Sequence, residues 1–352
     1  MTPILLAFAA FLPAFDEDAA RHLYPQTTER VAIINFAVIR DSGYWTDEIN
    51  QGFEQGFADN EQAKVISKLL DVEPNSLEKF TICETNVGGP GPDRVLFIVN
   101  GKFPFEKATQ GLADLGKQGE LTTLTVHDQP VYYNHRAKDA SYFTLLDDHT
   151  LIFSAAKGLI TDSLDGLKDL REPKPELLER LKWEEDVTTF AIKLTGVLPP
   201  EAREGIGRIP NMEAIAKKLE GYNVIATLGE SPSVKITLNM ADSESATLMA
   251  TQLNGFVTFA KLTAGQNPRQ DLVALLDKLS IRGESKEVNI SLSISSEQFA
   301  DIVLQNKKDR EKWQEKAKER RDQRRKAREG KPTPPPGDAA KPAANPPKKD
   351  GV

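Results

Sequence analysis

The residues best suited to chemistry are three histidines and three aspartates within one short region of the chain: His127, His135, His149, Asp128, Asp147 and Asp148. Imidazole and carboxylate groups are ligands that zinc and iron accept in proteins. Their spacing matches no recognised metal motif, and two of the histidines stand in the turn sequences HDQP and DDHT, where polar side chains collect for structural reasons. We therefore expect solvated turn histidines and no cofactor, with a metal site as the alternative.

Nucleophilic catalysis has little support in the sequence. A hydrolase serine stands in a strained Gly-x-Ser-x-Gly turn, and Ser154 and Ser231 lack those glycines. The single cysteine, Cys83, lies in the strand-like sequence FTICET, which favours a small buried side chain over a reactive thiol. One cysteine also excludes an intramolecular disulfide. We therefore expect a protein without catalytic residues that is not an enzyme.

A basic segment near the C-terminus gives the strongest compositional signal. Residues 307–352 contain 16 Lys and Arg against 8 Asp and Glu, a net charge of +8, which leaves −15 for residues 1–306 in a chain of net charge −7. Residues 307–329 consist mainly of helix-forming residues with almost no apolar stripe, and residues 330–352 are rich in Pro, Ala and Lys. These compositions predict an exposed charged helix followed by a disordered tail.

The basic helix has two alternative roles. It is either a solvated solubility element, free or resting on the acidic body of its own chain, or a site that attracts nucleic acid or an acidic envelope polymer through non-specific charge. The candidate contacts for such a polyanion are the cations of its second half: Lys316, Lys318, Arg320, Arg321, Arg324, Arg325, Lys326 and Arg328.

The N-terminal segment predicts export. Residues 3–15, PILLAFAAFLPAF, form an apolar run about as long as a signal-peptide core and shorter than the roughly 20 residues of a membrane-spanning helix. We therefore expect a signal peptide at residues 1–20 and a mature protein in the periplasm or cell envelope. No basic residue precedes the run and no small-x-small site follows it, so an amphiphilic N-terminal helix of a cytoplasmic protein is the alternative.

Units of a strand followed by a helix recur along the chain, and they must position the candidate residues described above. In residues 234–253 an alternating strand precedes Asp242, which predicts a helix N-cap, and residues 288–304 repeat the design with Ser295 and Gln298 as a capping box. Period-two alternation predicts a half-buried strand. We expect one face of the first strand to carry its apolar residues and the other its polar ones: Val234, Ile236, Leu238 and Met240 against Lys235, Thr237 and Asn239.

Other segments predict further elements of the same kind. Residues 31–39, VAIINFAVI, predict a central strand covered on both faces. A helix is expected to begin at Pro104 and end at Gly116, followed by an antiparallel meander of four strands in residues 121–155. Helices are also expected at residues 46–58 and near residues 65–70, and a turn at residues 86–93.

The order of elements repeats along the chain. Strand, helical segment, hairpin, helix, hairpin and helix occur first in residues 21–172 and again in residues 173–306, with the Pro-containing sequence REPKP at the boundary. We predict an α+β fold of two related halves, each an antiparallel sheet with helices packed mainly on one face. The basic helix at 307–329 and the tail at 330–352 follow the second half.

Four sequence blocks carry a family resemblance that extends over most of residues 21–305: RHLYPQTTERVAIINF, FIVNGKFPFEK, LLDDHTLIFSAAKGLITDSLDGL and VKITLNMADSESATLMA. They resemble uncharacterised exported bacterial proteins built from α+β repeats, a group with no established activity. The resemblance implies the fold and export and assigns no functional residue. We expect a non-enzymatic exported structural or binding protein, and the alternatives are a polyanion binder and a carrier of an apolar ligand between sheet and helices.

Truncation after Gln305 tests the polyanion hypothesis. If the cations of residues 316–328 bind polyanions, the full chain is retained on heparin, its retention falls as salt rises, and the truncated chain elutes without retention. Heparin chromatography over a salt gradient measures the difference. Equal retention of the two proteins would refute the hypothesis.

Overall fold

The computed structural model describes residues 20–44, 50, 51, 54, 74–86, 94–134, 141–181, 190–198, 200–209, 212–265, 270–302, 305, 316, 319 and 320. The chain forms two compact units, Met1–Gln298 and Phe299–Val352. In the second unit the described residues are helical, and Lys316, Glu319 and Arg320 are exposed. Within the described part of the chain, no helix is both long and apolar enough to span a membrane.

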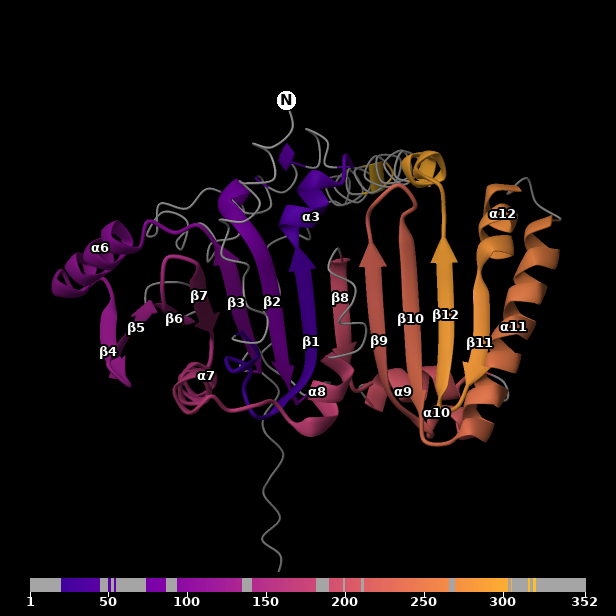
Figure 1. Ribbon diagram of the computed structural model, residues 1–352, viewed down its shortest axis with the longest axis horizontal. Helices are drawn as coiled ribbons and strands as arrows, with labels where there is room; N and C mark the ends of the chain where they lie inside the picture. The colour runs from indigo at the N-terminus through magenta and orange to yellow at the C-terminus, as the bar shows by residue number, and fades with distance from the viewer. Residues whose placement is uncertain are drawn as a thin grey trace, which may run out of the picture. The chain divides into compact units, whose positions relative to one another are not determined.

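In the described part of the chain, twelve strands form one antiparallel sheet in the order β11-β12-β10-β9-β8-β1-β2-β3-β7-β6-β5-β4 (Figure 1). The fold is therefore a mixed α+β fold with one large sheet, which confirms the expected class. The strands are β1 Thr28–Asn35, β2 Leu77–Thr85, β3 Val95–Gly101, β4 Thr122–Val126, β5 Gln129–Asn134, β6 Ser141–Leu145, β7 Thr150–Ser154, β8 Phe190–Gly196, β9 Leu219–Thr227, β10 Ser233–Met240, β11 Ser280–Glu284 and β12 Glu287–Ser293. The predicted meander is confirmed as β4 to β7.

The helices connect these strands or follow them. They are α3 Phe36–Asp41, the short 3-10 helix Pro74–Ser76, α6 Phe105–Lys117, α7 Lys157–Asp169, α8 Pro175–Leu181, α9 Pro200–Gly207, α10 Glu213–Ala216, α11 Ser243–Gly265 and α12 Gln270–Lys278. Helical backbone also begins at Ser296. Side chains supply the expected caps: Asp242 Oδ1 accepts the Ser245 N–H at 2.8 Å, and Ser295 and Gln298 exchange two hydrogen bonds of 3.3 Å.

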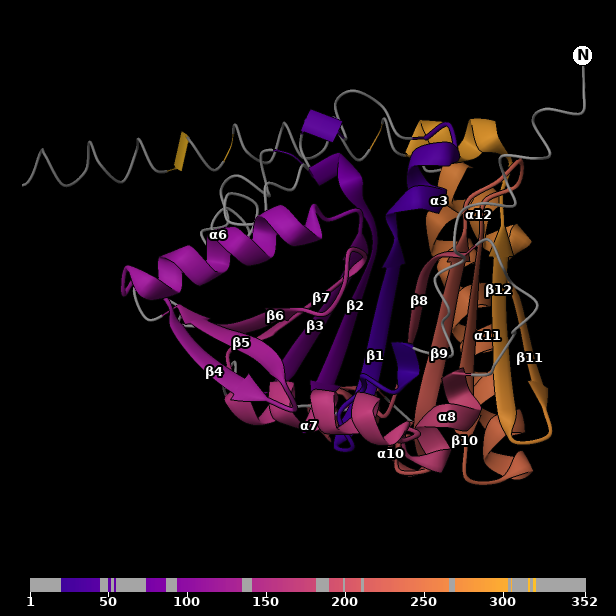
Figure 2. The same ribbon diagram turned by 60° about the vertical axis from the view of Figure 1, so that its left-hand side comes forward.

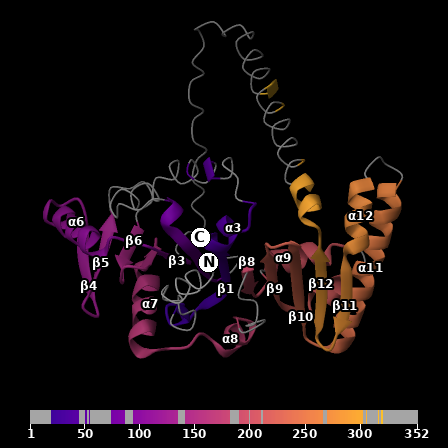
Figure 3. The same cartoon turned by 45° about the horizontal axis from the view of Figure 1, so that its top comes forward.

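Cross-strand registers define two faces of the sheet, face A with Val31 and Cys83 and face B with Ala32 and Ile82. On face A, α7 lies against β3, β6 and β7, and α8 lies against β1 and β8 (Figure 3). These elements enclose one hydrophobic core because α7 and α8 direct their apolar sides to the sheet. Its buried members include Val31, Cys83, Leu96, Ile160, Leu164 and Leu177.

Face B has two separate cores. The helices that contribute to them, α6 and α11, lie near opposite ends of the sheet (Figure 2). Near β4, Leu112 of α6 packs with Val99 and Leu151 of the sheet. Near β11, Met249 of α11 packs with Val288 of β12. Helices therefore cover both faces, each over a different part of the sheet.

Two expected boundaries were wrong. The strand predicted for residues 31–39 ends at Asn35, because the Asn35 side chain accepts the Val38 N–H at 3.2 Å and caps α3. This local hydrogen bond overrides the β-propensity of the apolar residues that follow. Gly116 does not end its helix either. α6 continues to Lys117, and Gly119 supplies the residue with positive φ, +72°.

Two residues of β10 have the opposite burial from the one that we expected. Thr237 is fully buried on face A, where its hydroxyl donates to Asn289 Oδ1 at 2.9 Å. Val234, on face B, has 38% of its surface exposed. The alternation itself is present, but face A buries hydrogen-bonded polar residues here while face B leaves an apolar residue uncovered. Polarity alone therefore does not identify the solvated face of this strand.

Several expected segments fall wholly or mostly outside the described residues. These are the signal peptide at 1–20 except Ala20, the helices at 46–58 and near 65–70, the turn at 86–93 except Asn86, and the tail at 330–352. Of the expected helix at 46–58, the described residues Asn50, Gln51 and Glu54 are helical.

A charge scan of β12 tests the face assignment. Ile290→Asp is expected to lower the free energy of unfolding by about 2–4 kcal/mol, because Ile290 packs against the α11 core on face B. Ser291→Asp, one residue along on face A, is exposed and is expected to cost less than about 1 kcal/mol. Urea unfolding of both variants measures the difference, and equal effects would contradict the assignment.

Candidate functional site

The turn between β4 and β5 holds His127 against helix α7. His127 and Asp128 form the two-residue loop and have φ values of +48° and +62°, as in a type I′ turn. The His127 ring contacts the Asp165 carboxylate through Nε2, and its Nδ1 lies 3.3 Å from the Lys168 ammonium. Because a carboxylate accepts and an ammonium donates, the hydrogen-bond network assigns the imidazole proton to Nε2.

A cavity of about 660 Å³ opens beside this histidine. Its lining combines polar turn residues with the apolar side of α7: Thr125, His127, Asp128, Gln129, Leu164, Leu167 and Lys168. An oriented histidine is half of a nucleophile-and-base pair. The lining residues include neither Ser nor Cys, and Lys168 occupies the ring nitrogen that a nucleophile would use. The arrangement therefore fits a structural link between the turn and α7 better than a catalytic pair.

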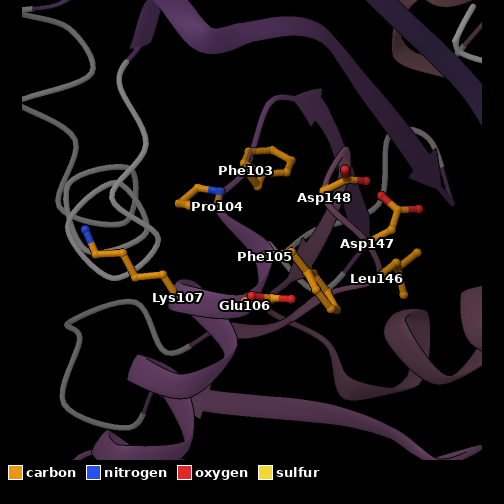
Figure 4. A pocket seen from close by; sticks show the side chains of 8 residues that line it. All are labelled: Phe103, Pro104, Phe105, Glu106, Lys107, Leu146, Asp147 and Asp148. Atoms are coloured by element: carbon orange, nitrogen blue, oxygen red, sulfur yellow. The ribbon is translucent and has the colours of Figure 1, made fainter.

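His149 lies in the turn between β6 and β7, beside a second cavity of about 650 Å³. Its ring Nδ1 donates to the Gly101 carbonyl at 3.0 Å, and its backbone N–H donates to Asp147 Oδ1 at 2.7 Å. Figure 4 shows Asp147 and Asp148 across the opening from Pro104, while Lys107 points away from it. The lining residues are Phe103, Pro104, Phe105, Glu106, Lys107, Leu146, Asp147 and Asp148.

The candidate metal ligands are not brought together. His127 is held by residues of α7, whereas His149 is held by the end of β3, and His135 lies outside the described residues. Among the residues that the structure describes, no group of three or more His, Cys, Asp or Glu side chains is arranged to hold a metal ion. The two described candidates, His127 and His149, serve as hydrogen-bonded turn residues, more tightly engaged than the solvated side chains that we expected.

The candidate nucleophiles occupy structural positions. Cys83 is completely buried in β2, and burial raises the pKa of its thiol well above the ordinary value, which disfavours the reactive thiolate. Ser154 is buried and donates to the Val95 carbonyl at 2.7 Å. Ser231 is exposed in the turn between β9 and β10. The prediction of a buried cysteine in a strand is confirmed.

The candidate polyanion contacts are described at two positions only. Lys316 and Arg320 are helical and exposed. The other six candidates lie outside the described residues: Lys318, Arg321, Arg324, Arg325, Lys326 and Arg328. Polyanion binding stays a prediction from composition.

The structure shows an apolar surface that sequence reasoning missed, on face B of the five middle strands β2, β1, β8, β9 and β10. Two adjacent rows of paired apolar residues cross these strands, and we call them the central apolar strip: Ile82, Ala32, Leu194, Val224 and Ile236 in one row, and Phe80, Ile34, Ile192, Ala226 and Val234 in the other. None of the ten is buried, and Ile192 and Val234 are 42% and 38% exposed. The strip contains no charged or polar side chain.

The borders of the strip have different chemistry. Phe80 lies in an aromatic cluster with Phe97 and Phe153, whose rings stack with centroids 4.6 Å apart. At one end of the strip, Glu84 pairs with Arg30, and its second oxygen lies 3.5 Å from an Arg94 nitrogen. The buried carboxylate of Glu84 is thereby neutralised, so the strip remains apolar up to this end.

The sequence holds only an indirect signal for this strip. Each strand shows apolar alternation, but the five strands are spread over residues 28–240. Their apolar residues become neighbours only through the pairing register of all five strands, which no local sequence pattern encodes.

The β4–β5 turn provides a test of the His127 geometry. Asp128→Gly is expected to raise the free energy of unfolding by roughly 0.5–1 kcal/mol, because glycine adopts positive φ without the steric cost of a side chain. Asp148→Gly is the control, since the φ of Asp148 is not positive, so glycine there relieves no backbone strain and increases unfolded-state entropy. Thermal unfolding compares the two, and stabilisation by both or by neither would contradict the turn geometry.

No protein-family model matches this chain, and no curated protein matches it. Among solved structures it is similar to crystal form III of TP0453, with 11% identity and a TM-score of 0.44, and to crystal form I of the same protein, with 11% identity and a TM-score of 0.45. Each match covers 81% of this chain, and 97% and 96% of the two TP0453 chains. Likeness of this degree assigns the chain to no family, and the resemblance to uncharacterised exported proteins stays a prediction.

Proposed function

We propose that this protein is a non-enzymatic exported protein that binds an apolar ligand on the central apolar strip. The observation that carries the proposal is the absence of any buried residue among the ten apolar side chains of the strip. Contiguous exposed apolar surface marks binding sites in soluble proteins, because its burial releases free energy on contact with a partner.

The surrounding structure supports a ligand site at this position. α6 covers the side chains next to β4 and α11 covers those next to β11, and between these two cores the short helix α3 contacts β2 and β8. Fully burying one Val, Leu or Ile side chain contributes about 1.5–3 kcal/mol. Covering the exposed parts of the ten residues of the strip therefore contributes favourable free energy to ligand binding.

We also propose that the sheet arose from two related halves, residues 21–172 and 173–306. The order of the strands supports this proposal. Outward from the β1–β8 junction, the strands of one side follow the order β1-β2-β3-β7-β6, and those of the other side follow the matching order β8-β9-β10-β12-β11. In each side a helical crossover follows the third strand, α6 in one and α11 with α12 in the other. β4 and β5 then form an additional hairpin at one edge.

Export and a non-enzymatic role belong to the same proposal. The apolar run at residues 3–15 supports a signal peptide and a periplasmic or envelope location. The structural roles of His127, His149, Cys83 and Ser154 support binding over catalysis. N-terminal sequencing of the protein from fractionated cells tests export, and an intact residue 1 in the cytoplasmic fraction would contradict it.

Binding of the neutral dye N-phenyl-1-naphthylamine tests the strip. The wild-type protein is expected to enhance its fluorescence with saturation, and Val234→Asp is expected to weaken binding at least about tenfold, because a bound apolar ligand would strip water from the carboxylate. The exposed position of Val234 lets the variant fold.

Ser291→Asp is the matched control for this experiment. It places the same charge on the opposite face of β12, so its dye affinity is expected to equal that of the wild type. Saturable binding with equal affinity in all three proteins would place the ligand elsewhere. No binding by the wild type, together with no apolar compound in native mass spectra of the purified protein, would refute the proposal.

A further inference from the structure

Helix α11 has an apolar surface on its outer side as well as its inner side. Its inner side carries the buried residues Ala246, Met249 and Ala250, which pack in the core with β12. Its outer side carries four of the eight large hydrophobic residues that are exposed in the described part of the chain: Leu248, Phe256, Phe259 and Leu262. Phe259 and Leu262 are 70% and 66% exposed. We call these four residues and Gly255 the outer face of α11.

The outer face of α11 carries no charge. Residues 245–260 contain no Asp, Glu, Lys or Arg, so sixteen consecutive helical residues are neutral. A helix on the surface of a monomer usually presents charged residues to solvent. The first charged residue after this run, Lys261, is paired with Asp277 of α12 at 2.8 Å. Solvation alone therefore does not account for the composition of this face.

Two residues of the outer face, Leu248 and Leu262, are spaced symmetrically about Gly255. Leu248, Gly255 and Leu262 are seven residues apart and lie on one stripe of the helix. A Cβ atom at Gly255 would meet nothing within 4 Å, so the backbone is open to close approach there. When two copies of α11 cross antiparallel at Gly255, Leu248 of each faces Leu262 of the other, and Phe259 faces Thr251.

We infer that the outer face of α11 is the interface of a two-fold symmetric dimer with a second copy of this chain. A two-fold interface requires a self-complementary surface, and an uncharged stripe with large residues on both sides of a glycine meets that requirement. Pairing with a charged surface would instead desolvate the charges of the partner without compensation. Antiparallel crossing also opposes the two helix dipoles favourably.

A lipid surface fits the outer face of α11 less well. Helices that lie in a membrane interface are rich in Lys and Arg around their apolar side. The single cation of α11, Lys261, is already paired, and residues 1–306 carry a net charge of −15, which anionic lipids repel.

Sedimentation velocity of the full chain tests the dimer. The wild type is expected to shift from monomer to dimer over roughly 1 to 100 µM, the affinity range of a small interface. Phe259→Lys is expected to remain a monomer throughout, because it places two charges in the interface. Leu170→Lys removes an equally exposed hydrophobic residue, 68% exposed at the end of α7, and is expected to dimerise like the wild type.

The Gly255→Leu variant distinguishes specific helix packing from non-specific hydrophobic association. The substitution increases apolar surface and helix propensity, yet it fills the point of closest approach, so dimer affinity is expected to fall at least about tenfold. Undiminished association of Gly255→Leu would overturn the inference, as would a wild type that stays monomeric at ~100 µM. Flotation of a monomeric wild type with vesicles of phosphatidylcholine and phosphatidylglycerol would assign the face to lipid and would overturn it too.

Discussion

The pairing of β1 with β8 is the constraint on which the rest of the sheet depends. It is the single junction between β1–β7 and β8–β12, and it runs from Arg30 opposite Gly196 to Ile34 opposite Ile192. A Cβ atom at Gly196 would lie 2.8 Å from the Arg30 Cα, so glycine permits this approach. The central apolar strip exists because this register aligns apolar residues from both sides. A shift of one residue would move half of the strip to face A.

The same register makes one row of face A apolar on the β1–β3 side of the junction and polar on the β8–β12 side. Across β1, β2 and β3 one row reads Val31, Cys83 and Leu96, and α7 and α8 cover it. The row continues as polar residues on the other side: Thr195, Asn223, Thr237, Asn289 and Arg282. These polar residues satisfy one another, as in the pairs Thr195 with Asn223 and Thr237 with Asn289. On face A the described helices α7 and α8 cover the apolar row, and α8 also contacts β8 at the start of the polar side.

Local sequence patterns were sufficient to predict most helices and strands, but they were insufficient to predict the His127 contacts and the central apolar strip. Alternation and caps predicted β10, α11 and the Ser295 capping box, because these signals lie within a few residues of one another. Asn35 shows the limit: its side chain stops a strand in the middle of an apolar run. The His127 contacts with α7 and the β1–β8 junction bring together residues 38 to about 160 positions apart, and no spacing in the sequence reports them.

The topology explains why the two cores of face B lie near opposite edges of the sheet. α6 leads from β3 to β4, the strand at one edge, and α11 with α12 leads from β10 to β11, the strand at the other edge. Each crossover helix must therefore pack over the strands on its way outward, and the residues that it covers become the two cores of face B. In the described part of the chain, the ten residues of the strip lie between these cores and keep partly exposed apolar side chains. The proposed ligand would cover this surface, because contact with a partner buries exposed apolar area.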